Sequence, residues 1–275
     1  MSSINEPNRK RGSDMANIKI VTDSSVQLTP EEISQHNITV VPLTIMIDNT
    51  VYIDGETITR DDFMDEMAAA QNLPKTSQPA VGTFADVFDK LTADGSEVLA
   101  IHMTETISGT VNSSRQAAQI AKGKVTVIDS QFTDRAMAFQ VLVAAEMAEA
   151  GKDMKTILDK LEQVRDNTTL VLGVTNLDNL VKGGRLSRVS GLISSFLNIK
   201  VILQLQNGEL KALRKGRGMK TINNFIAETI AKMAKLSNIK SVGISTAGAK
   251  ELGEDIGRRI AEVLPSCLLY TSDAA

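Results

Sequence analysis

Residues 101–121 read IHMTETISGTVNSSRQAAQIA, and this stretch determines the kind of fold that the chain can adopt. The apolar run 97–103 ends inside it and is typical of a strand buried in a parallel sheet. A polar loop around Ser108 and Gly109 follows, and residues 112–122 carry apolar side chains at helical spacing. The sequence therefore predicts a buried strand, a short polar loop and a helix in direct succession.

The loop between this strand and this helix has the composition of an anion-binding site. We expect Ser108 to act as the N-cap of the helix, and Gly109 lets the backbone approach a ligand closely. The first N–H groups of a helix have no partner within it, and the helix dipole is positive at this end. Together these features favour an anionic head group. The alternative is an ordinary N-cap without a ligand.

Composition excludes several classes of protein. The 275 residues suffice for one large domain or two smaller ones, and a formal net charge of −3 does not favour a general nucleic-acid surface. No apolar run reaches the roughly 18 residues that span a membrane, and we expect no signal peptide before the first strand. The single cysteine, Cys267, rules out an internal disulfide and fits a reducing cytoplasm. Two widely spaced histidines and one cysteine argue against a structural zinc site.

The first part of the chain alternates strands and helices, and polar residues stand where three strands end: Asp23-Ser24, 104–108 and Asp129-Ser130. This pattern is typical of a doubly wound parallel sheet, whose ligands bind beyond the carboxyl ends of the strands. Pro42 places the second strand at an edge or a bulge. Residues 75–79 (KTSQP) form a polar segment that we expect near the first helix. The predicted strands are 18–22, 38–48, 50–53, 97–103 and 124–129; the predicted helices begin near Pro30 or span 62–70, 82–92, 112–122, 136–150 and 154–167.

The second part has the character of an α+β layer and is not a repeat of the first. Residues 183–187 (GGRLS) predict a turn that presents Arg185 and opens a helix over 187–196. Asn207-Gly208 predicts a hairpin between strands 200–206 and 209–214. The other predicted elements are a strand over 170–174, a short helix over 175–182, a helix over 221–236, a strand over 241–245 and a helix over 249–263, with no element after Pro265.

Motifs for nucleotide binding and for hydrolysis are missing from the sequence. Neither G-x-x-x-x-G-K-[ST] nor G-x-G-x-x-G after a strand occurs, and Ser108 lacks the G-x-S-x-G context of a nucleophile. A Ser–His–Asp triad needs His36 or His102 to reach Ser108. We expect His102, which lies on a strand, to be a structural histidine whose hydrogen bonds are satisfied. An acyl hydrolase that depends on Ser108 is kept as the alternative enzyme function.

A cluster of basic residues stands near the end of the predicted hairpin. Such a cluster is usually a solvated face, and its alternative is a docking patch for an acidic partner. Its members are Lys211, Arg214, Lys215, Arg217 and Lys220.

Eight short motifs follow one another along the chain: VTDSS (21–25), VVPLTIMID (40–48), LPKTSQPAVGTF (73–84), IHMTETISGTVNSS (101–114), VTVIDS (125–130), NLDNLVKGGRLS (176–187), LISSFLNIKVIL (192–203) and KGRGMKT (215–221). In this order and spacing the chain resembles the DegV family from about residue 19 to residue 263. The resemblance implies a two-domain α/β protein that holds one long-chain fatty acid in a buried tunnel between its domains and needs no cofactor.

Some members of this family serve as the fatty-acid-binding subunit of a bacterial fatty acid kinase, whose separate catalytic subunit uses ATP to phosphorylate the carboxylate for phospholipid synthesis. The resemblance implies that Thr76 and Ser108 hydrogen-bond the carboxylate, and it assigns no catalytic or metal-binding residue. A carrier or regulatory protein without a kinase is a further alternative. We expect contacts with the head group or the partner from Ser77, Gly109, Thr110 and Arg185.

The residue patterns and the resemblance together predict how the chain is divided. We expect a disordered leader over 1–16, a parallel-sheet α/β domain over 17–167 and a smaller α+β domain over 168–265, with the ligand tunnel between the two domains. Family members continue with a strand and a segment that contains histidine and glycine. Residues 266–275 differ from that pattern, so we expect a truncated second domain followed by a tail unlike the family.

Overall fold

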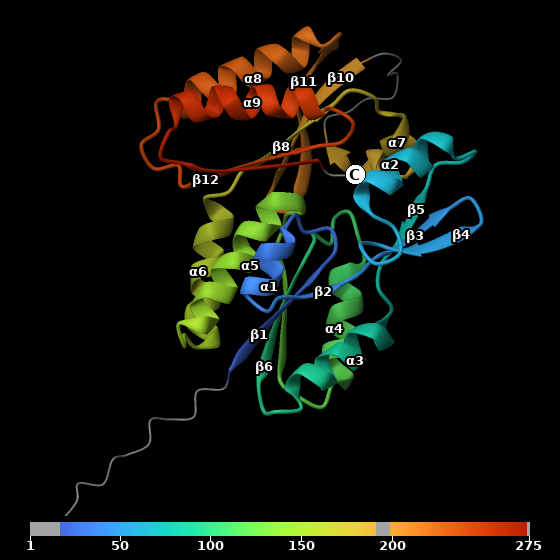
Figure 1. The fold of residues 1–275 in the computed structure, drawn as a ribbon, viewed down its shortest axis with the longest axis vertical. Helices are drawn as coiled ribbons and strands as arrows, with labels where there is room; N and C mark the ends of the chain where they lie inside the picture. The colour runs from blue at the N-terminus through green and yellow to red at the C-terminus, as the bar shows by residue number, and fades with distance from the viewer. Residues whose placement is uncertain (1–16, 191–198, 274–275) are drawn as a thin grey trace, which may run out of the picture.

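The computed structural model describes residues 17–190 and 199–273. Its N-terminal half is built on a four-stranded parallel sheet in the order β2-β1-β6-β7 (Figure 1). The strands are β1 (Ile18–Asp23), β2 (Thr39–Val41), β6 (Glu97–His102) and β7 (Val125–Asp129). The doubly wound parallel sheet predicted for this half is confirmed.

Helices cover both faces of this sheet, as its continuous apolar strands require. Alternate residues of β6 serve the two faces: Leu99 and Ile101 pack in one core with helices α5 and α6, whereas Val98 and Ala100 pack in another with α3 and α4. The helices of this half are α1 (Pro30–Gln35), α2 (Arg60–Ala69), α3 (Val81–Thr92), α4 (Thr110–Ile120), α5 (Asp134–Glu149) and α6 (Met154–Asp166).

The single strand predicted over 38–48 is wrong, because the structure divides it at Pro42. Proline donates no backbone hydrogen bond. Strand β2 ends before it at the edge of the parallel sheet, as expected for a strand next to a proline. Strand β3 (Thr44–Ile47) then belongs to a separate antiparallel sheet, between β4 (Thr50–Ile53) and β5 (Lys75–Ser77).

The C-terminal half contains the predicted hairpin within a second sheet, of order β8-β10-β11-β9. Asn207 and Gly208 have positive φ angles of 52° and 72°, as a tight hairpin turn requires. The elements are β8 (Leu170–Val174), α7 (Asp178–Lys182), the 3-10 turn η1 (Leu186–Arg188), β9 (Val189–Ser190), β10 (Ile199–Gln206), β11 (Glu209–Arg217), α8 (Lys220–Met233), β12 (Ser241–Thr246), α9 (Lys250–Val263) and β13 (Leu268–Asp273).

Two predictions for this half are wrong. Residues 187–196 do not begin as a helix, because η1 is followed directly by the short strand β9, which pairs with β11; the remainder, 191–196, lies outside the described residues. The segment after Pro265 does form an element: β13 pairs in parallel with β12 over six residue pairs, from Ser241 with Leu268 to Thr246 with Asp273. The other predicted elements lie within a few residues of their observed bounds. The leader predicted over 1–16 lies outside the described residues.

One apolar core joins the two halves, which lie at opposite ends of the long axis (Figure 1). It combines Ile101 and Met137 of the first half with Leu203, Leu205 and Leu210 of the second. None of the described helices is long and apolar enough to cross a membrane.

A buried arginine attaches the β12–β13 pair to the first half. The guanidinium of Arg135 makes two hydrogen bonds of 2.6 and 2.7 Å with Glu32 and donates to the Gln27 carbonyl at 2.7 Å. Its centre lies 3.5 Å from the centroid of the Tyr270 ring on β13. The tail after Pro265 is therefore held by contacts that residue patterns alone did not predict.

Candidate functional site

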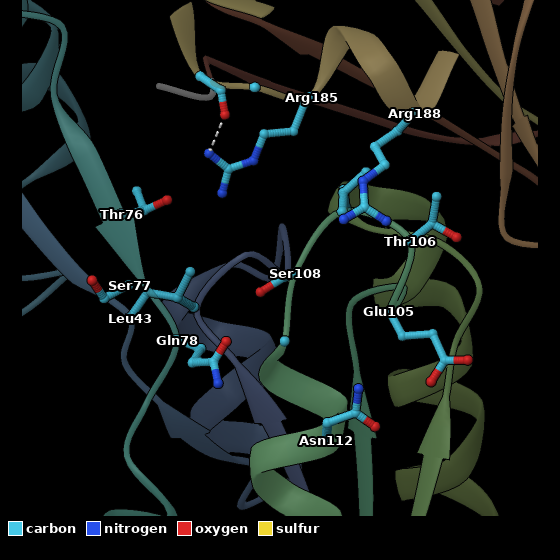
Figure 2. Close-up of a pocket in the computed structure, with 14 residues that line it drawn as sticks. Leu43, Thr76, Ser77, Gln78, Glu105, Thr106, Ser108, Asn112, Arg185 and Arg188 are labelled. Atoms are coloured by element: carbon cyan, nitrogen blue, oxygen red, sulfur yellow. Dashed lines mark hydrogen bonds between the residues drawn. The ribbon is translucent and has the colours of Figure 1, made fainter. Parts of the chain in front are cut away.

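A cleft of about 790 Å³ lies where the β5 strand, the loop after β6 and the turn after α7 meet (Figure 2). These three segments are far apart in the sequence. Its lining is mostly polar, with Leu43 and Ile107 as the large apolar side chains. The lining residues are Leu43, Thr76, Ser77, Gln78, Glu105, Thr106, Ile107, Ser108, Gly109, Asn112, Gly183, Gly184, Arg185 and Arg188.

The loop between β6 and α4 brings Ser108 to the centre of this cleft. The prediction that Ser108 is the N-cap is wrong: Gly109 occupies that position, and none of the described side chains caps the helix. Ser108 stands one residue earlier, where its hydroxyl lies 2.8 Å from the Thr110 hydroxyl and accepts a bond of 3.3 Å from the Thr110 N–H. Thr110 is fully buried beneath it. These contacts with Thr110 thus orient the Ser108 hydroxyl at the N-terminus of α4.

Another side chain closely approaches the backbone of Gly109. A Cβ atom at this position would lie 2.8 Å from Cδ of Gln78 and still closer to Oε1 of the same amide. The φ angle of Gly109 is −80°, so the backbone itself is open to other residues. The sequence predicts that a ligand approaches the backbone of Gly109. In the structure, the group that approaches this backbone is the Gln78 amide.

The opposite wall of the cleft is the edge strand β5, which carries Thr76 and Ser77. Its pairing with β3 places Thr76 opposite Ile45 and Ser77 opposite Thr44. The hydroxyl of Ser113 on α4 donates to the Pro79 carbonyl at 2.7 Å. This buried bond ties the chain that follows β5 to the helix that follows Ser108, and so fixes the two hydroxyl-bearing walls relative to each other.

The third wall comes from the C-terminal half and is basic. Gly184 has a φ angle of 74°, which favours glycine, and the turn that it forms projects Arg185. In Figure 2 the guanidinium groups of Arg185 and Arg188 both reach down from this wall, Arg185 toward Thr76 and Arg188 toward Thr106. Arg185 donates to the Gly183 carbonyl at 2.9 Å. The cleft therefore combines hydroxyl groups on two walls with positive charge on the third.

Acidic groups near the cleft are already paired or buried. The carboxylate of Glu105, on the cleft lining, lies 2.6 Å from Arg115. Behind it, burial raises the pKa of Asp129, although the N–H groups of Gln131 and Glu105 donate to this carboxyl.

His102 is the structural histidine that the sequence predicted. Its side chain is fully buried, with Nδ1 3.1 Å from Asp23 and Nε2 2.9 Å from the hydroxyl of Ser114. Burial alone would raise the pKa of Asp23, but hydrogen bonds from His102, Ser25 and the Met103 N–H outweigh it and hold that pKa below its ordinary value. Both ring nitrogens are therefore occupied by partners other than Ser108.

The cleft brings together five of the six site residues predicted from the sequence: Thr76, Ser77, Ser108, Gly109 and Arg185. The sixth, Thr110, is absent from the described lining, but its hydroxyl is hydrogen-bonded to that of Ser108. The sequence reading missed five polar residues of the lining, namely Gln78, Glu105, Thr106, Asn112 and Arg188. Arg188 could have been predicted from Arg185, because it lies three residues later and residues three apart share one side of a 3-10 turn.

Within residues 17–190 and 199–273 no group of three or more His, Cys, Asp or Glu side chains is arranged to hold a metal ion. The donors of the cleft are hydroxyls, amides and guanidiniums, which suit an anion. The small residues of the stretch 187–198 offer room for an alkyl chain. Most of this stretch lies outside the described residues, so the path of an alkyl chain stays a prediction.

Comparison with known proteins relates this chain to one family. A family model described as "Uncharacterised protein, DegV family COG1307" matches residues 17–274. A DegV domain-containing protein of Streptococcus pneumoniae is 48% identical over 246 residues, which cover 88% of each chain. The crystal structure of DegV, a fatty acid binding protein from Bacillus subtilis, is 28% identical with a TM-score of 0.86 and covers 94% of this chain and 93% of its own. A stearic acid-binding protein from Eubacterium ventriosum is also 28% identical, with a TM-score of 0.80 over 91% of this chain and 89% of its own. The chain belongs to the DegV family.

Proposed function

We propose that this protein binds one long-chain fatty acid, holds its carboxylate at Thr76 and Ser108, and presents that carboxylate to a separate ATP-dependent kinase. The observation that carries the proposal is the cleft itself. Thr76 and Ser108 lie on different walls of one cleft, beneath the guanidinium of Arg185 (Figure 2). The relatives of similar fold from Bacillus subtilis and Eubacterium ventriosum are described as binding a fatty acid and stearic acid, which supports the choice of ligand.

The alkyl chain and the carboxylate of the fatty acid contribute different amounts of binding free energy. Each buried methylene contributes ~0.8 kcal/mol, so about fifteen of them contribute on the order of 12 kcal/mol before the costs of binding. A hydrogen bond to a charged group contributes roughly 1.5–3 kcal/mol. We therefore assign most of the affinity to the alkyl chain, which runs from the cleft into the apolar region between the halves. Thr76 and Ser108 then serve to orient the carboxylate.

An oriented carboxylate at an open cleft suits phosphorylation by a partner. In that reaction a carboxylate oxygen forms a bond to the γ-phosphorus of ATP, while the bond from that phosphorus to ADP breaks and ADP leaves with the electron pair. The product is an acyl phosphate, which we place on the route to phospholipids. We propose that the partner supplies the ATP site and that the reaction takes place in the cytoplasm.

The basic cluster near the end of β11 is the proposed docking patch for this partner. Lys211 is paired with Glu209 at 2.8 Å, and Arg214 forms two bonds with Glu228 at 3.0 and 2.7 Å. In the part of the chain that the structure describes, Arg217 and Lys220 are exposed and form no ion pair. These two cations carry the charge that an acidic partner would meet.

The alternative of an acyl hydrolase meets a physical obstacle. Asp23, His102 and Ser114 have the connectivity of a hydrolytic triad, but each side chain is fully buried. Ser108, which is accessible from the cleft, has no histidine partner among the described residues. Hydrolysis of a p-nitrophenyl ester that disappears in Ser108→Ala would support the hydrolase. A carrier without a kinase would yield no ATP-dependent partner when the protein is used to capture proteins from a bacterial lysate.

Native mass spectrometry of the protein expressed in bacteria tests the proposed ligand. We expect one fatty acid per chain, released by organic extraction and identified by its mass. A delipidated sample should take up one equivalent of palmitate. A protein that is folded, carries no fatty acid and takes up no palmitate would overturn the proposal.

A further inference from the structure

The turn of the hairpin between β10 and β11 contacts the loop that presents Ser108. The hydroxyl of Thr106 in this loop donates to the carbonyl of Gly208 in the turn. A Cβ atom at Gly208 would lie 3.5 Å from the Thr104 hydroxyl and 3.7 Å from that of Thr106, so the turn is in close contact with both side chains. A turn of the C-terminal half therefore packs directly against the loop that follows β6 in the N-terminal half.

The N-terminal half holds the part of this loop that precedes Thr106. The N–H of Thr104 donates at 2.8 Å to a carbonyl of the chain that follows β7. The N–H of Glu105 donates at 3.3 Å to the carboxylate of Asp129, at the end of β7. The next residue, Thr106, is bonded to the C-terminal half, and Ser108 follows two residues later. The place of the Ser108 hydroxyl therefore depends on contacts with both halves.

The side chain of Thr106 lines the cleft, but its proton is already used (Figure 2). A threonine hydroxyl has one proton to donate, and in Thr106 this proton goes to the Gly208 carbonyl. A carboxylate only accepts hydrogen bonds, so Thr106 cannot donate to a fatty acid while this bond is present. Any effect of Thr106 on the head group must therefore pass through the loop that carries Ser108.

The strands of the same hairpin pack in the apolar core that joins the two halves. Leu203, Leu205 and Leu210 are buried in this core together with Ile101 of β6. The proposed function places the alkyl chain in the apolar region between the halves. The hairpin therefore borders that region through its strands and contacts the loop of the carboxylate through its turn.

We propose that Thr106 is a positioning residue for the carboxylate, because its bond to the Gly208 carbonyl keeps Ser108 where its hydroxyl reaches the head group. This role rests on the proposed function and adds to it that a hairpin of one half sets the orientation of a carboxylate held by the other. Threonine suits this role, because its branched side chain has few rotamers and the backbone of the loop thus fixes the direction of the hydroxyl. Loss of the bond frees the loop, and the bound head group moves with it.

Carbon-13 NMR of palmitate labelled at its carboxyl carbon tests this role, because the label reports the surroundings of the head group alone. Thr106→Val removes the hydroxyl and keeps the shape of the side chain, whereas Thr106→Ser keeps the hydroxyl. Thr229→Val is the matched control, since it removes a hydroxyl that donates to a carbonyl within α8, outside the described cleft lining. Ser108→Ala gives the resonance of a carboxylate that has lost its serine partner.

We expect the parent protein to bind one palmitate and to show one carboxyl resonance. Thr106→Val should still take up one equivalent, with an affinity within about 2-fold of the parent, because the alkyl chain supplies most of the binding free energy. Its carboxyl resonance should move toward the position found in Ser108→Ala. Thr106→Ser and Thr229→Val should keep the resonance of the parent.

A resonance in Thr106→Val that equals that of the parent would overturn the positioning role and leave the proposed function intact. An equal displacement in Thr106→Ser or Thr229→Val would do the same, because the bond to Gly208 would then not be its cause. If Thr106→Val does not fold, Thr106→Ala, which also lacks the hydroxyl, decides by the same criterion. A parent protein that binds no palmitate, or a Ser108→Ala resonance equal to that of the parent, would overturn the proposed function and the positioning role with it.

Discussion

Nε2 of His102 lies 2.9 Å from the hydroxyl of Ser114, and this bond joins the end of β6 to the first turns of α4. Because the carboxylate of Asp23 only accepts, Nδ1 of the ring carries the proton that it shares with Asp23. Asp23 also accepts from the Met103 N–H at 2.9 Å. The ends of β1 and β6 and the start of α4 are thereby fixed around the loop that presents Ser108.

Replacing Ser114 by alanine should destabilise the fold. The variant leaves a ring nitrogen without a partner in a fully buried position, which costs about 1–3 kcal/mol. Urea unfolding of Ser114→Ala measures this change in the free energy of unfolding. Gln116→Ala, at an exposed position of the same helix, is the control and should stay within about 0.5 kcal/mol of the parent. Equal unfolding midpoints for both variants would show that the buried bond does not stabilise the fold.

Ser108→Ala should separate binding from phosphorylation. The alkyl chain supplies most of the proposed affinity, so the variant keeps its fatty acid in native mass spectrometry. Loss of a hydrogen bond that orients the carboxylate should slow phosphorylation by roughly 10- to 100-fold in an assay with the reconstituted kinase. Ser34→Ala on the exposed face of α1 serves as the control. Full turnover by Ser108→Ala would contradict the assigned role.

Charge reversal at Arg217 and Lys220 should weaken the association with the kinase. Exposed charges mainly steer encounter, so the expected effect is a slower association rate that depends on salt. The fatty acid content should not change, because neither residue lines the cleft. The double reversal Lys90→Glu with Lys152→Glu makes the same change in net charge elsewhere on the surface. If both double variants associate equally well with the kinase, the cluster is a solvated face.

The pH dependence of stability should reveal the buried carboxyl of Asp134. Burial raises its pKa above the ordinary value despite a bond of 2.8 Å from the Ser245 hydroxyl. A raised folded pKa means that the native state binds more protons than the unfolded state between the ordinary and the folded pKa. The contribution of this group to stability therefore falls as the pH rises through that window.

Asp134→Asn lacks this charge, and asparagine tolerates the φ angle of 58° and can accept from Ser245. We expect its melting temperature to exceed that of the parent at pH 7, with the difference shrinking toward pH 4. Asp65→Asn, at an exposed position on α2, should show no comparable trend. A difference that stays constant between pH 4 and pH 7 would rule out the buried charge as its cause.

The parallel sheet could be predicted because its strands carry continuous apolar runs between polar ends. Pro42 marked an edge, yet the chain on its two sides enters two different sheets, and that partition depends on pairing partners distant in sequence. Strand β13 was missed because its place is set by backbone pairing with β12 and by the ring of Tyr270 over Arg135. Neither contact can be recognised from the residues that neighbour β13 in the sequence.

Only part of the cleft lining could be predicted, again because some contacts join segments that are distant in sequence. The polar loop after a buried strand indicated Ser108, and resemblance to a family supplied Thr76 and Arg185. The structure brings all three to one cleft. Gln78 could not be assigned from its own neighbourhood, because its contact with Gly109 exists only after β5 and α4 have been brought together. Tertiary contact therefore decided which polar residues of these loops line the cleft.

The contact between Gly109 and Gln78 predicts a specific coupling. In Gly109→Ala the new Cβ would collide with the end of the Gln78 side chain, which is exposed and has room to rotate away. The backbone at φ −80° accepts alanine, so the free energy of unfolding should fall by no more than about 1 kcal/mol, the usual effect of alanine at an N-cap. The Gln78 amide, however, leaves its place beside Ser108. We therefore expect slower phosphorylation of the bound fatty acid in Gly109→Ala.

Gln78→Ala should have a similar effect, and the double variant should be no slower than Gln78→Ala alone. Such non-additivity is the signature of two residues that act through one contact. Additive losses in the double variant would show that Gly109 affects the head group by a route that does not involve Gln78.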